Sequence, residues 1–307
     1  MRPKERELAR TLEGQLKKFD KICPLRGIQL RPCREAFVEQ LVESVRRVRY
    51  VSVIGNREVS PLRADASSDL FDPLRAAIIQ QRRGNLEEAF WLVFLFVHFG
   101  RNQRTGWRLA RDVYGALSSR NYWTWAKTVA DPKGFRRWLA THEATLRGAD
   151  GIARAFGNHR KYESLGETAI VAESYVDWVN PPRTHQLLVA EAQDQVAGDP
   201  RKTFDYLYRS MQKVHRFGRL ARFDYLTMVG KLRLARIEPG SAYIQHATGP
   251  RDGARMLFGR RNAEATQLEE WLKELDRYLG LDFGMQVLED ALCNWQKSPA
   301  QFKPFRG

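Results

Sequence analysis

Asp224 is the leading candidate for a catalytic carboxylate in this sequence. It directly follows the apolar residue Phe223 in a segment with helical periodicity, so it lies near the apolar flank of that helix. A carboxylate there is costly unless it is paired, and the flanking Arg219 and Arg222 are the obvious partners. Both arginines are also candidates for contacts with DNA or the base. Asp224 is therefore either half of a structural ion pair or a carboxylate held beside a reacting sugar, as cleavage through an oxocarbenium-like transition state requires.

Glu289 is the second candidate carboxylate. Apolar residues recur around it at i, i+4 and i+7 of a helical segment, namely Leu288, Leu292 and Trp295. Glu289 and Cys293 share the neighbouring face of the same helix. A polar cluster beside an aromatic residue is unusual for a simple C-terminal cap, so we expect Glu289 to be functional. Lys297 would be its ion-pair partner or a phosphate contact.

Two tight turns between these carboxylates, Pro239-Gly240 and Gly249-Pro250, resemble phosphate-binding elements. Each is expected to open a short helix whose N-terminal amides can face a phosphate. Arg251 and Arg255 stand at the second helix start, where a DNA-backbone contact would need them, and Tyr243 lies between the turns. Such turns also occur in proteins that bind nothing.

Residues 148–166 have little periodicity but contain a dense polar string from Phe156 to Ser164. A loop of that length inside a globular domain is usually functional or disordered, and the aromatic and charged content favours function. The candidates for holding a flipped nucleotide or its sugar decoration are Asn158, His159, Arg160 and Lys161. The alternative is an ordinary solvated loop.

The elements that must position these residues are helices. Apolar residues recur at helical spacing in residues 5–19, 33–48, 69–83, 85–99, 105–117, 132–146, 184–196, 199–214, 219–232, 263–279 and 283–294. Residues 50–54 are the only convincing short β-like run. The pattern predicts an all-α, multi-helical fold with at most a minor strand or hairpin. Tyr122, Trp123 and Trp125 fit the core better than a DNA-wedging role. We expect an N-terminal helical cap and linker over residues 1–68 and a catalytic domain over residues 69–307.

Composition indicates the class of partner. The 307 residues carry a formal charge of +15 and a pI near 10, and such an excess attracts polyanions through counterion release. A basic protein without a nucleic-acid role is the alternative, and scattered basic residues disfavour a membrane surface. No apolar run is long enough for a membrane span, the charged N-terminus does not resemble a signal peptide, and three distant cysteines suit the cytoplasm.

Several classes of enzyme are disfavoured. The six histidines are isolated, and Cys23 and Cys33 lack partners at zinc-site spacing, so no metal site is expected. The sequence has no Walker loop, dinucleotide fingerprint or nucleophile elbow. We therefore expect no cofactor.

Three of these segments resemble the family of alpha-glutamyl/putrescinyl-thymine pyrophosphorylases, which is similar to helix-hairpin-helix DNA glycosylases. A glycine-to-acid element is matched by Gly218, Leu220, Ala221 and Asp224, and a Gly-Pro turn is matched by Gly249-Pro250, with Arg251 where glycine is common. A closing Glu-x-x-Leu-Cys-x-x-x-Lys element is matched by Glu289, Leu292, Cys293 and Lys297. The resemblance covers residues 85–307. Residues 239–242 would form the hairpin of a helix-hairpin-helix motif. This segment lacks the second glycine that the glycosylases have in their hairpin.

The resemblance implies a helix-hairpin-helix fold and an enzyme that acts on modified bases in double-stranded DNA. We favour a monomeric antiviral glycosylase that flips out and excises a bulky pyrimidine, for example a glucosylated one, with Asp224 as the first and Glu289 as the second catalytic carboxylate. Lys231 would attack the sugar in a lyase variant. One alternative is a transferase that displaces pyrophosphate from an activated hydroxymethyl-uracil. Another is a non-enzymatic DNA-binding module.

Overall fold

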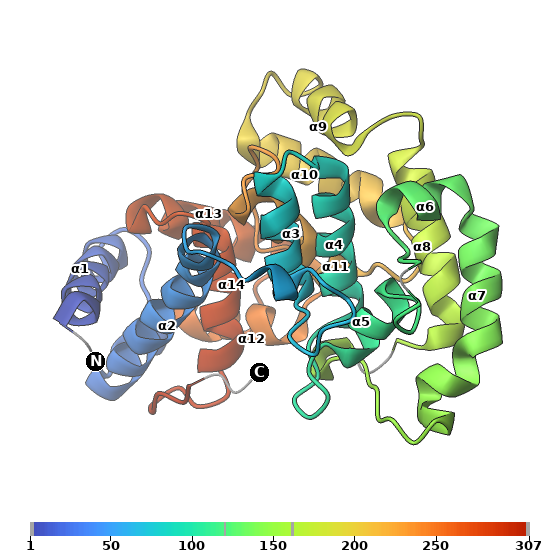
Figure 1. Cartoon of the computed structure of the whole chain (residues 1–307). Coiled ribbons are helices and arrows are strands. Elements are labelled where there is room, and N and C mark those ends of the chain that lie inside the picture. Colours follow the sequence, from blue (N-terminus) through green and yellow to red (C-terminus); the bar gives the residue numbers. More distant parts are fainter. Residues whose placement is uncertain (1–2, 120, 161–162, 305–307) are drawn as a thin grey trace. The chain divides into compact units, whose positions relative to one another are not determined.

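Helices account for most of the residues that the structure describes, which are 3–119, 121–160 and 163–304. In this computed structural model those residues form fourteen α-helices and no strand, so the predicted all-α, multi-helical fold is confirmed. The chain divides into two compact units (Figure 1). Unit 1 contains Met1–Ser52 and Glu238–Arg306, and unit 2 contains Val53–Ile237.

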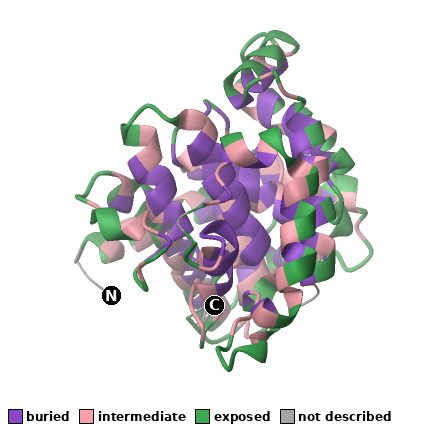
Figure 2. Cartoon of the chain, turned by 45° about the vertical axis from the view of Figure 1, so that its right-hand side comes forward, coloured by how far each residue is buried: buried purple, intermediate pink, exposed green. Residues whose placement is uncertain are grey.

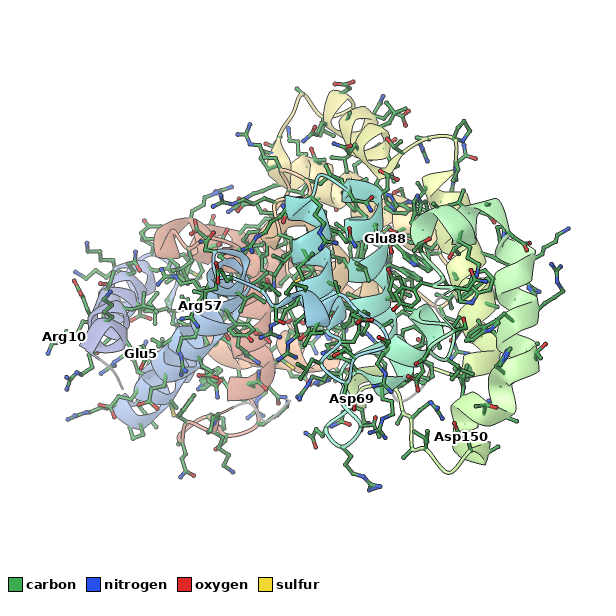
Figure 3. The ribbon with its side chains drawn as sticks, viewed as in Figure 1. Glu5, Arg10, Arg57, Asp69, Glu88 and Asp150 are labelled. Carbon is green, nitrogen blue, oxygen red and sulfur yellow. The ribbon has the colours of Figure 1, made fainter. Side chains whose placement is uncertain are left out.

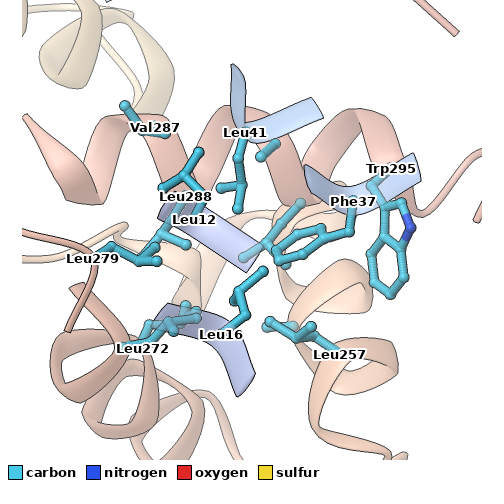
Figure 4. Close-up of a cluster of buried hydrophobic side chains, with 14 of the residues drawn as sticks. Leu12, Leu16, Phe37, Leu41, Leu257, Leu272, Leu279, Val287, Leu288 and Trp295 are labelled. Carbon is cyan, nitrogen blue, oxygen red and sulfur yellow. The ribbon is translucent and has the colours of Figure 1, made fainter. Parts of the chain in front are cut away.

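Unit 1 is built from both ends of the chain. Its helices are α1 (Pro3–Asp20), most of α2 (Arg31–Gly55), α12 (Thr248–Phe258), α13 (Ala265–Leu279) and α14 (Gly284–Trp295). Their apolar faces meet in one core, whose most buried members include Leu12, Leu16, Phe37, Leu41, Leu257, Leu272, Leu288 and Trp295 (Figure 4). Burial of each such side chain contributes about 2 kcal/mol, so residues far apart in sequence hold each other in place.

Helices α12 and α14 approach closely because α12 carries a glycine at their crossing. A Cβ atom on Gly253 would lie 2.5 Å from the carbonyl oxygen of Leu292, nearer than any side chain tolerates. One turn earlier, a Cβ atom on Gly249 would lie 3.0 Å from Sγ of Cys293. The Gly-Pro turn and the closing Glu-x-x-Leu-Cys element are therefore neighbours within unit 1.

Unit 2 is organised around α4 (Leu86–Phe99), which is apolar on nearly every side and buried along its length (Figure 2). The other helices of the unit are α3 (Pro73–Arg82), α5 (Arg108–Tyr114), α6 (Trp125–Ala130), α7 (Pro132–Ala144), α8 (Leu165–Val179), α9 (His185–Asp194), α10 (Pro200–Ser210) and α11 (Arg219–Lys231). Helices α3, α5, α6, α9 and α11 contact α4 directly. Trp123 and Trp125 are buried in this unit, as predicted.

Capping side chains explain where several of these helices begin. Asp72 accepts a hydrogen bond from the backbone N–H of Arg75, and proline follows it at the first helical position of α3. The same combination of aspartate and proline starts α7 and α10. Helix α3 consequently starts at Pro73, a few residues later than the predicted segment 69–83.

One expectation about local structure was wrong. Residues 50–54, the predicted β-like run, are the last turns of α2. Val45, Val48, Val51 and Ile54 recur every three residues and are all buried, so a helical stripe outweighs the β-branched composition. Helix α8 was not expected; its apolar residues cover more than one face, so no single stripe stands out.

The described helices include none that is long and apolar enough to cross a membrane. The predicted division into a cap over residues 1–68 and a catalytic domain over residues 69–307 stays a prediction.

Candidate functional site

The side chains of Asp224 and Arg160 meet in unit 2. Asp224 lies in the second turn of α11, and Arg160 ends the 3₁₀ turn η4 (Asn158–Arg160). Nη2 of Arg160 donates to Oδ2 of Asp224 at 2.8 Å. The arginine side chain is 11% exposed and that of the aspartate 36% exposed, so a buried cation holds a carboxylate that solvent can reach. A predicted catalytic residue and a predicted base-binding residue thus come together.

The backbone beneath Arg160 is fixed to the end of α4. Nε of Arg160 donates to the carbonyl oxygen of Val97 at 2.7 Å, and the N–H of Gly157 donates to the carbonyl oxygen of Phe99 at 2.8 Å. A Cβ atom on Gly157 would lie 2.7 Å from the carbonyl carbon of Gly100, which has a φ of +63°. The close approach of these two backbones therefore sets the position of the guanidinium.

Arg222 was a predicted partner of Asp224, but its side chain contacts Tyr208 instead. Its guanidinium lies 4.4 Å from the ring centre of Tyr208 and donates to the carbonyl oxygen of that residue at 3.2 Å. Arg219 lies 5.6 Å from the ring of Phe223. Side chains adjacent in a helix point in different directions, so neighbours in sequence were poor candidates.

Glu163 is a site residue that sequence reasoning missed. Its carboxylate is 16% exposed, and Oε2 lies 3.5 Å from Nε of Arg216. Burial raises the pKa of Glu163, against the opposing effect of the Arg216 and Arg160 charges. The residue stands in the polar string of residues 156–164, but no motif or period distinguishes it there.

A neutral histidine lies under this charged group. His98 is buried near the end of α4, with Nε2 3.1 Å from Oγ1 of Thr168 and its ring stacked on Phe94. Burial, together with the positive charges of Arg160 and Arg216, lowers the pKa of His98 to about 3. The imidazole therefore adds no positive charge beneath the Arg160–Asp224 pair at neutral pH.

A chain of buried hydrogen bonds supports α11 next to Asp224. Oη of Tyr225 lies 2.7 Å from Oη of Tyr175, which lies 2.7 Å from Nε2 of His185. Nδ1 of His185 lies 2.7 Å from Oε2 of Glu87 on α4. Burial lowers the pKa of His185, against the opposing effect of the Glu87 carboxylate. The network joins α4, α8, α9 and α11 and limits rotation of α11.

The next residue of α4 is a buried glutamate. Glu88, labelled in Figure 3, accepts hydrogen bonds from Oη of Tyr114 at 2.8 Å and from the N–H of Trp125 at 2.7 Å. Burial raises the pKa of this carboxyl, against the effect of those two donors. Glu88 therefore has a structural role, because its two hydrogen bonds link α5 and α6 to α4.

The other predicted residues of unit 2 have varied surroundings. Asn158 and His159 are exposed on the same 3₁₀ turn as Arg160. Lys161 lies outside the described residues. Lys231 is half-buried at the end of α11. The role of Asn158 and His159 in holding a flipped nucleotide stays a prediction.

In unit 1, Glu289 is buried on α14 with 8% of its surface exposed. Lys297 follows the end of that helix and is exposed, and its Nζ lies 3.4 Å from Oδ1 of Asn294 rather than pairing with Glu289. Glu289 belongs to unit 1 and Asp224 to unit 2. The pocket expected around both carboxylates stays a prediction.

The two predicted turns of unit 1 are built differently. The Gly249-Pro250 turn opens α12, as expected, whereas the Pro239-Gly240 turn leads only to the 3₁₀ turn Ile244–His246. Glu269 of α13 fixes the segment that follows Pro239-Gly240. Its carboxylate accepts hydrogen bonds from Oγ of Ser241 and from the N–H of Ile244, each at 2.6 Å. Tyr243, between them, has a φ of +50°.

Both arginines of α12 donate hydrogen bonds to backbone carbonyl groups of neighbouring segments. Nε and Nη2 of Arg255 donate to the carbonyl oxygen of Ala263 at 3.2 Å. Nη1 of Arg251 donates to the carbonyl oxygen of Gln245 at 3.4 Å. Arg255 therefore fixes the connection that follows α12, and a phosphate-binding role for either arginine stays a prediction.

Comparison with known proteins identifies the class of protein to which this site belongs. A family model of enzymes that process modified thymine matches residues 33–307, which is most of the chain. The chain belongs to this family, alpha-glutamyl/putrescinyl thymine pyrophosphorylase clade 3. The resemblance inferred from the three motifs is thereby confirmed. No curated protein and no solved structure matches the chain.

Proposed function

We propose that the protein is a DNA glycosylase that flips out a bulky modified pyrimidine, such as a glucosylated hydroxymethyl-pyrimidine, and excises it from duplex DNA. The product would be an abasic site. The observation that carries the proposal is the Asp224–Arg160 pair, in which a partly exposed carboxylate is held by a buried guanidinium. This arrangement suits a group that must face an oxocarbenium-like sugar without moving.

In the proposed reaction, the bond between C1′ of the deoxyribose and the base nitrogen breaks, and its electron pair leaves with the base. The positive charge on the sugar is stabilised by the Asp224 carboxylate. Asp224 then accepts a proton from the water whose oxygen bonds to C1′. Arg160 keeps the carboxylate aimed at the sugar through its second hydrogen bond to the carbonyl oxygen of Val97.

Glu163 is the proposed proton donor to the departing base. Its raised pKa keeps the carboxyl protonated at higher pH than an ordinary glutamic acid. A pair of carboxyl groups with different environments, one paired with arginine and one largely buried, is the pattern that separates acid and base roles. Asn158 and His159, exposed on the adjoining turn, would contact the flipped nucleotide or its sugar.

The predicted residues of unit 1 are proposed as DNA contacts, apart from Glu289. Lys297 is exposed and would bind a phosphate. Glu289 would be a second catalytic carboxylate, and Tyr243, Arg251 and Arg255 would contact the backbone or the base. We propose that the chain acts as a monomer in the cytoplasm, in defence against phage whose DNA carries the modified base.

The second candidate is a transferase, which the family description favours. An amine nitrogen would bond to the methylene carbon of an activated hydroxymethyl-uracil while the bond from that carbon to the pyrophosphate oxygen breaks. Asp224 or Glu289 would accept the amine proton. This reaction needs a pyrophosphorylated base, whereas the glycosylase needs only modified DNA and water.

The test is to incubate the protein with glucosylated, hydroxymethylated and plain duplex DNA without amine or activated precursor. The glycosylase is expected to release free base from one of the modified substrates and to leave alkali-sensitive sites. Absence of free base here, together with pyrophosphate release and amine incorporation when precursor and amine are added, would replace it with the transferase. DNA binding without any product would support a binding module.

A further inference from the structure

Residues 100–107, which we name the arginine loop, join α4 to α5 and carry two exposed arginines, Arg101 and Arg104. Within the described ranges, neither guanidinium forms an ion pair or a hydrogen bond. Most of the other arginines around the site have partners, as Arg160 has Asp224 and Arg154 has Asp112. Two unneutralised cations on one short loop form a local positive surface.

The arginine loop is internally braced. The N–H and carbonyl groups of Asn102 and Gly106 exchange two hydrogen bonds of 3.0 Å. Oδ1 of Asn102 accepts from the N–H of Arg104 at 2.9 Å and from the N–H of Thr105 at 3.0 Å. At the end of the loop, the ring of Trp107 packs 5.1 Å from that of Phe96. The positions of both arginine backbones are therefore set before any ligand binds.

The arginine loop is also attached to the segment that carries Arg160. Nδ2 of Asn102 donates to the carbonyl oxygen of Phe156 at 2.9 Å, and Nη1 of Arg108 donates to that of Ala153 at 3.1 Å. A Cβ atom on Gly100, its first residue, would lie 3.1 Å from the Cγ atom of Arg160 and 3.3 Å from the Cα atom of Gly157. In Figure 1 the loop extends downward beyond α4 and α5. A rigid link thus connects the two free cations to the Asp224 site.

We infer that the arginine loop is a clamp for backbone phosphates of duplex DNA, placed to hold the strand whose nucleotide enters the Asp224 site. Guanidinium groups bind phosphate oxygens strongly, and bracing reduces the entropy lost on binding. The inference rests on the proposed function and adds a binding surface to it. A free anion such as pyrophosphate shares this chemistry, and the test below separates the two ligands.

The experiment compares the wild-type chain with R101A/R104A in binding a plain, fluorescently labelled duplex between about 50 and about 200 mM salt. The slope of log affinity against log salt is expected to fall by about 1.8, or about 0.9 for each lost phosphate contact. R101K/R104K should recover most of that slope. Thermal unfolding of each variant reports whether the fold is intact.

The matched control is R57A/R83A. Arg57, labelled in Figure 3, and Arg83 are exposed arginines of unit 2. Arg83 precedes α4, whereas the arginine loop follows it, so the length of α4, about 20 Å, separates them. The carbonyl oxygen of Arg57 accepts a hydrogen bond at 2.7 Å from Nη2 of Arg82, the neighbour of Arg83. This control removes the same charge and should keep the wild-type slope. An equal loss of slope in both double variants would mean that net charge alone matters, which would overturn the clamp. The clamp would also be overturned if R101A/R104A bound the duplex with the same affinity and slope as the wild type.

A titration with inorganic pyrophosphate at constant ionic strength completes the test. Unchanged DNA binding combined with weaker pyrophosphate binding in R101A/R104A would overturn the clamp in favour of a free-anion site. Base release by the wild type is measured separately. If the wild type releases base and R101A/R104A keeps the wild-type slope, only the clamp is wrong. If the wild type does not bind duplex DNA, the clamp and the proposed function both fail.

Discussion

The guanidinium of Arg160 lies 2.8 Å from Oδ2 of Asp224, although the two residues are 64 positions apart in the chain. The same guanidinium donates to the carbonyl oxygen of Val97, so the pair is fastened to α4 and α11 at once.

Replacing Asp224 with Asn should lower the rate of base release by at least about 100-fold, because the amide cannot stabilise a positive sugar or accept a proton from water. Affinity for duplex DNA should stay within about two-fold, since the change adds no negative charge. D205N is the control, because Asp205 is a partly exposed aspartate of the same unit, paired with Arg209. A D224N protein with wild-type turnover would remove Asp224 from the mechanism.

R160K should lower turnover by about ten-fold while retaining the fold. Lysine keeps the charge but cannot donate to Asp224 and to Val97 in the planar geometry that arginine provides. The effects of R160K and D224N should not add, since both act through one carboxylate. Rates of the single and double variants provide the measurement, and additive losses would show that Arg160 acts independently of Asp224.

The pH profile should reveal Glu163. A proton donor is active in its protonated form, so activity should fall as the pH rises through the pKa of this carboxyl, which burial raises. E163Q should be slower and should lack this fall on the alkaline side. The profile of kcat/KM measured for both proteins tests this expectation, and an unchanged profile in E163Q would assign the proton donor elsewhere.

His98 should make the protein less stable in mild acid. Its pKa is lowered from an ordinary 6.5 to about 3, so between these pH values the histidine is protonated in the unfolded chain but neutral in the folded chain. The stability contributed by the neutral ring is present above pH 6.5 and is lost progressively as the pH falls toward 3. Between about pH 7.5 and about pH 5.5 the loss is about 1.4 kcal/mol.

H98Q is the comparison for this effect, because glutamine can still hydrogen-bond to Thr168 and does not titrate. Urea unfolding at the two pH values should show the additional loss in the wild type only. Equal losses in both proteins would mean that the ring of His98 is protonated in the folded state.

G157A should lower stability and activity together. The added Cβ atom would lie 2.7 Å from the carbonyl carbon of Gly100, so one of the two backbones must move, and Arg160 moves with it. We expect a cost of about 2 kcal/mol and at least a ten-fold loss of turnover. G166A is the control, since nothing lies within 4 Å of a Cβ atom there and the residue is helical. A fully active G157A would show that the junction does not position Arg160.

The sequence predicted the helices well because their apolar spacing and their aspartate or threonine caps are local signals. It failed at residues 50–54, where β-branched residues continue a buried helical stripe. Asp224 and Arg160 were both identified from sequence, but their contact was not, because it depends on where a loop packs against α4. Local reasoning named Arg222, which instead binds Tyr208.

Glu163 and the arginine loop could not be singled out from residue types. Glu163 acquires its properties from burial beside Arg216. Arg101 and Arg104 are distinguished by their loop, which Asn102 attaches to the segment that carries Arg160. Both properties arise only from the three-dimensional packing of segments that carry no motif.

The construction of unit 1 from Met1–Ser52 and Glu238–Arg306 has a consequence for biosynthesis. Helices α1 and α2 leave the ribosome long before α12, α13 and α14, which bury the apolar faces of Leu12, Leu16 and Phe37. At about 5–20 residues per second, the roughly 185 residues of unit 2 separate the two halves by about 10–40 seconds. During that interval the nascent chain exposes an amphipathic pair that is a natural client for a chaperone.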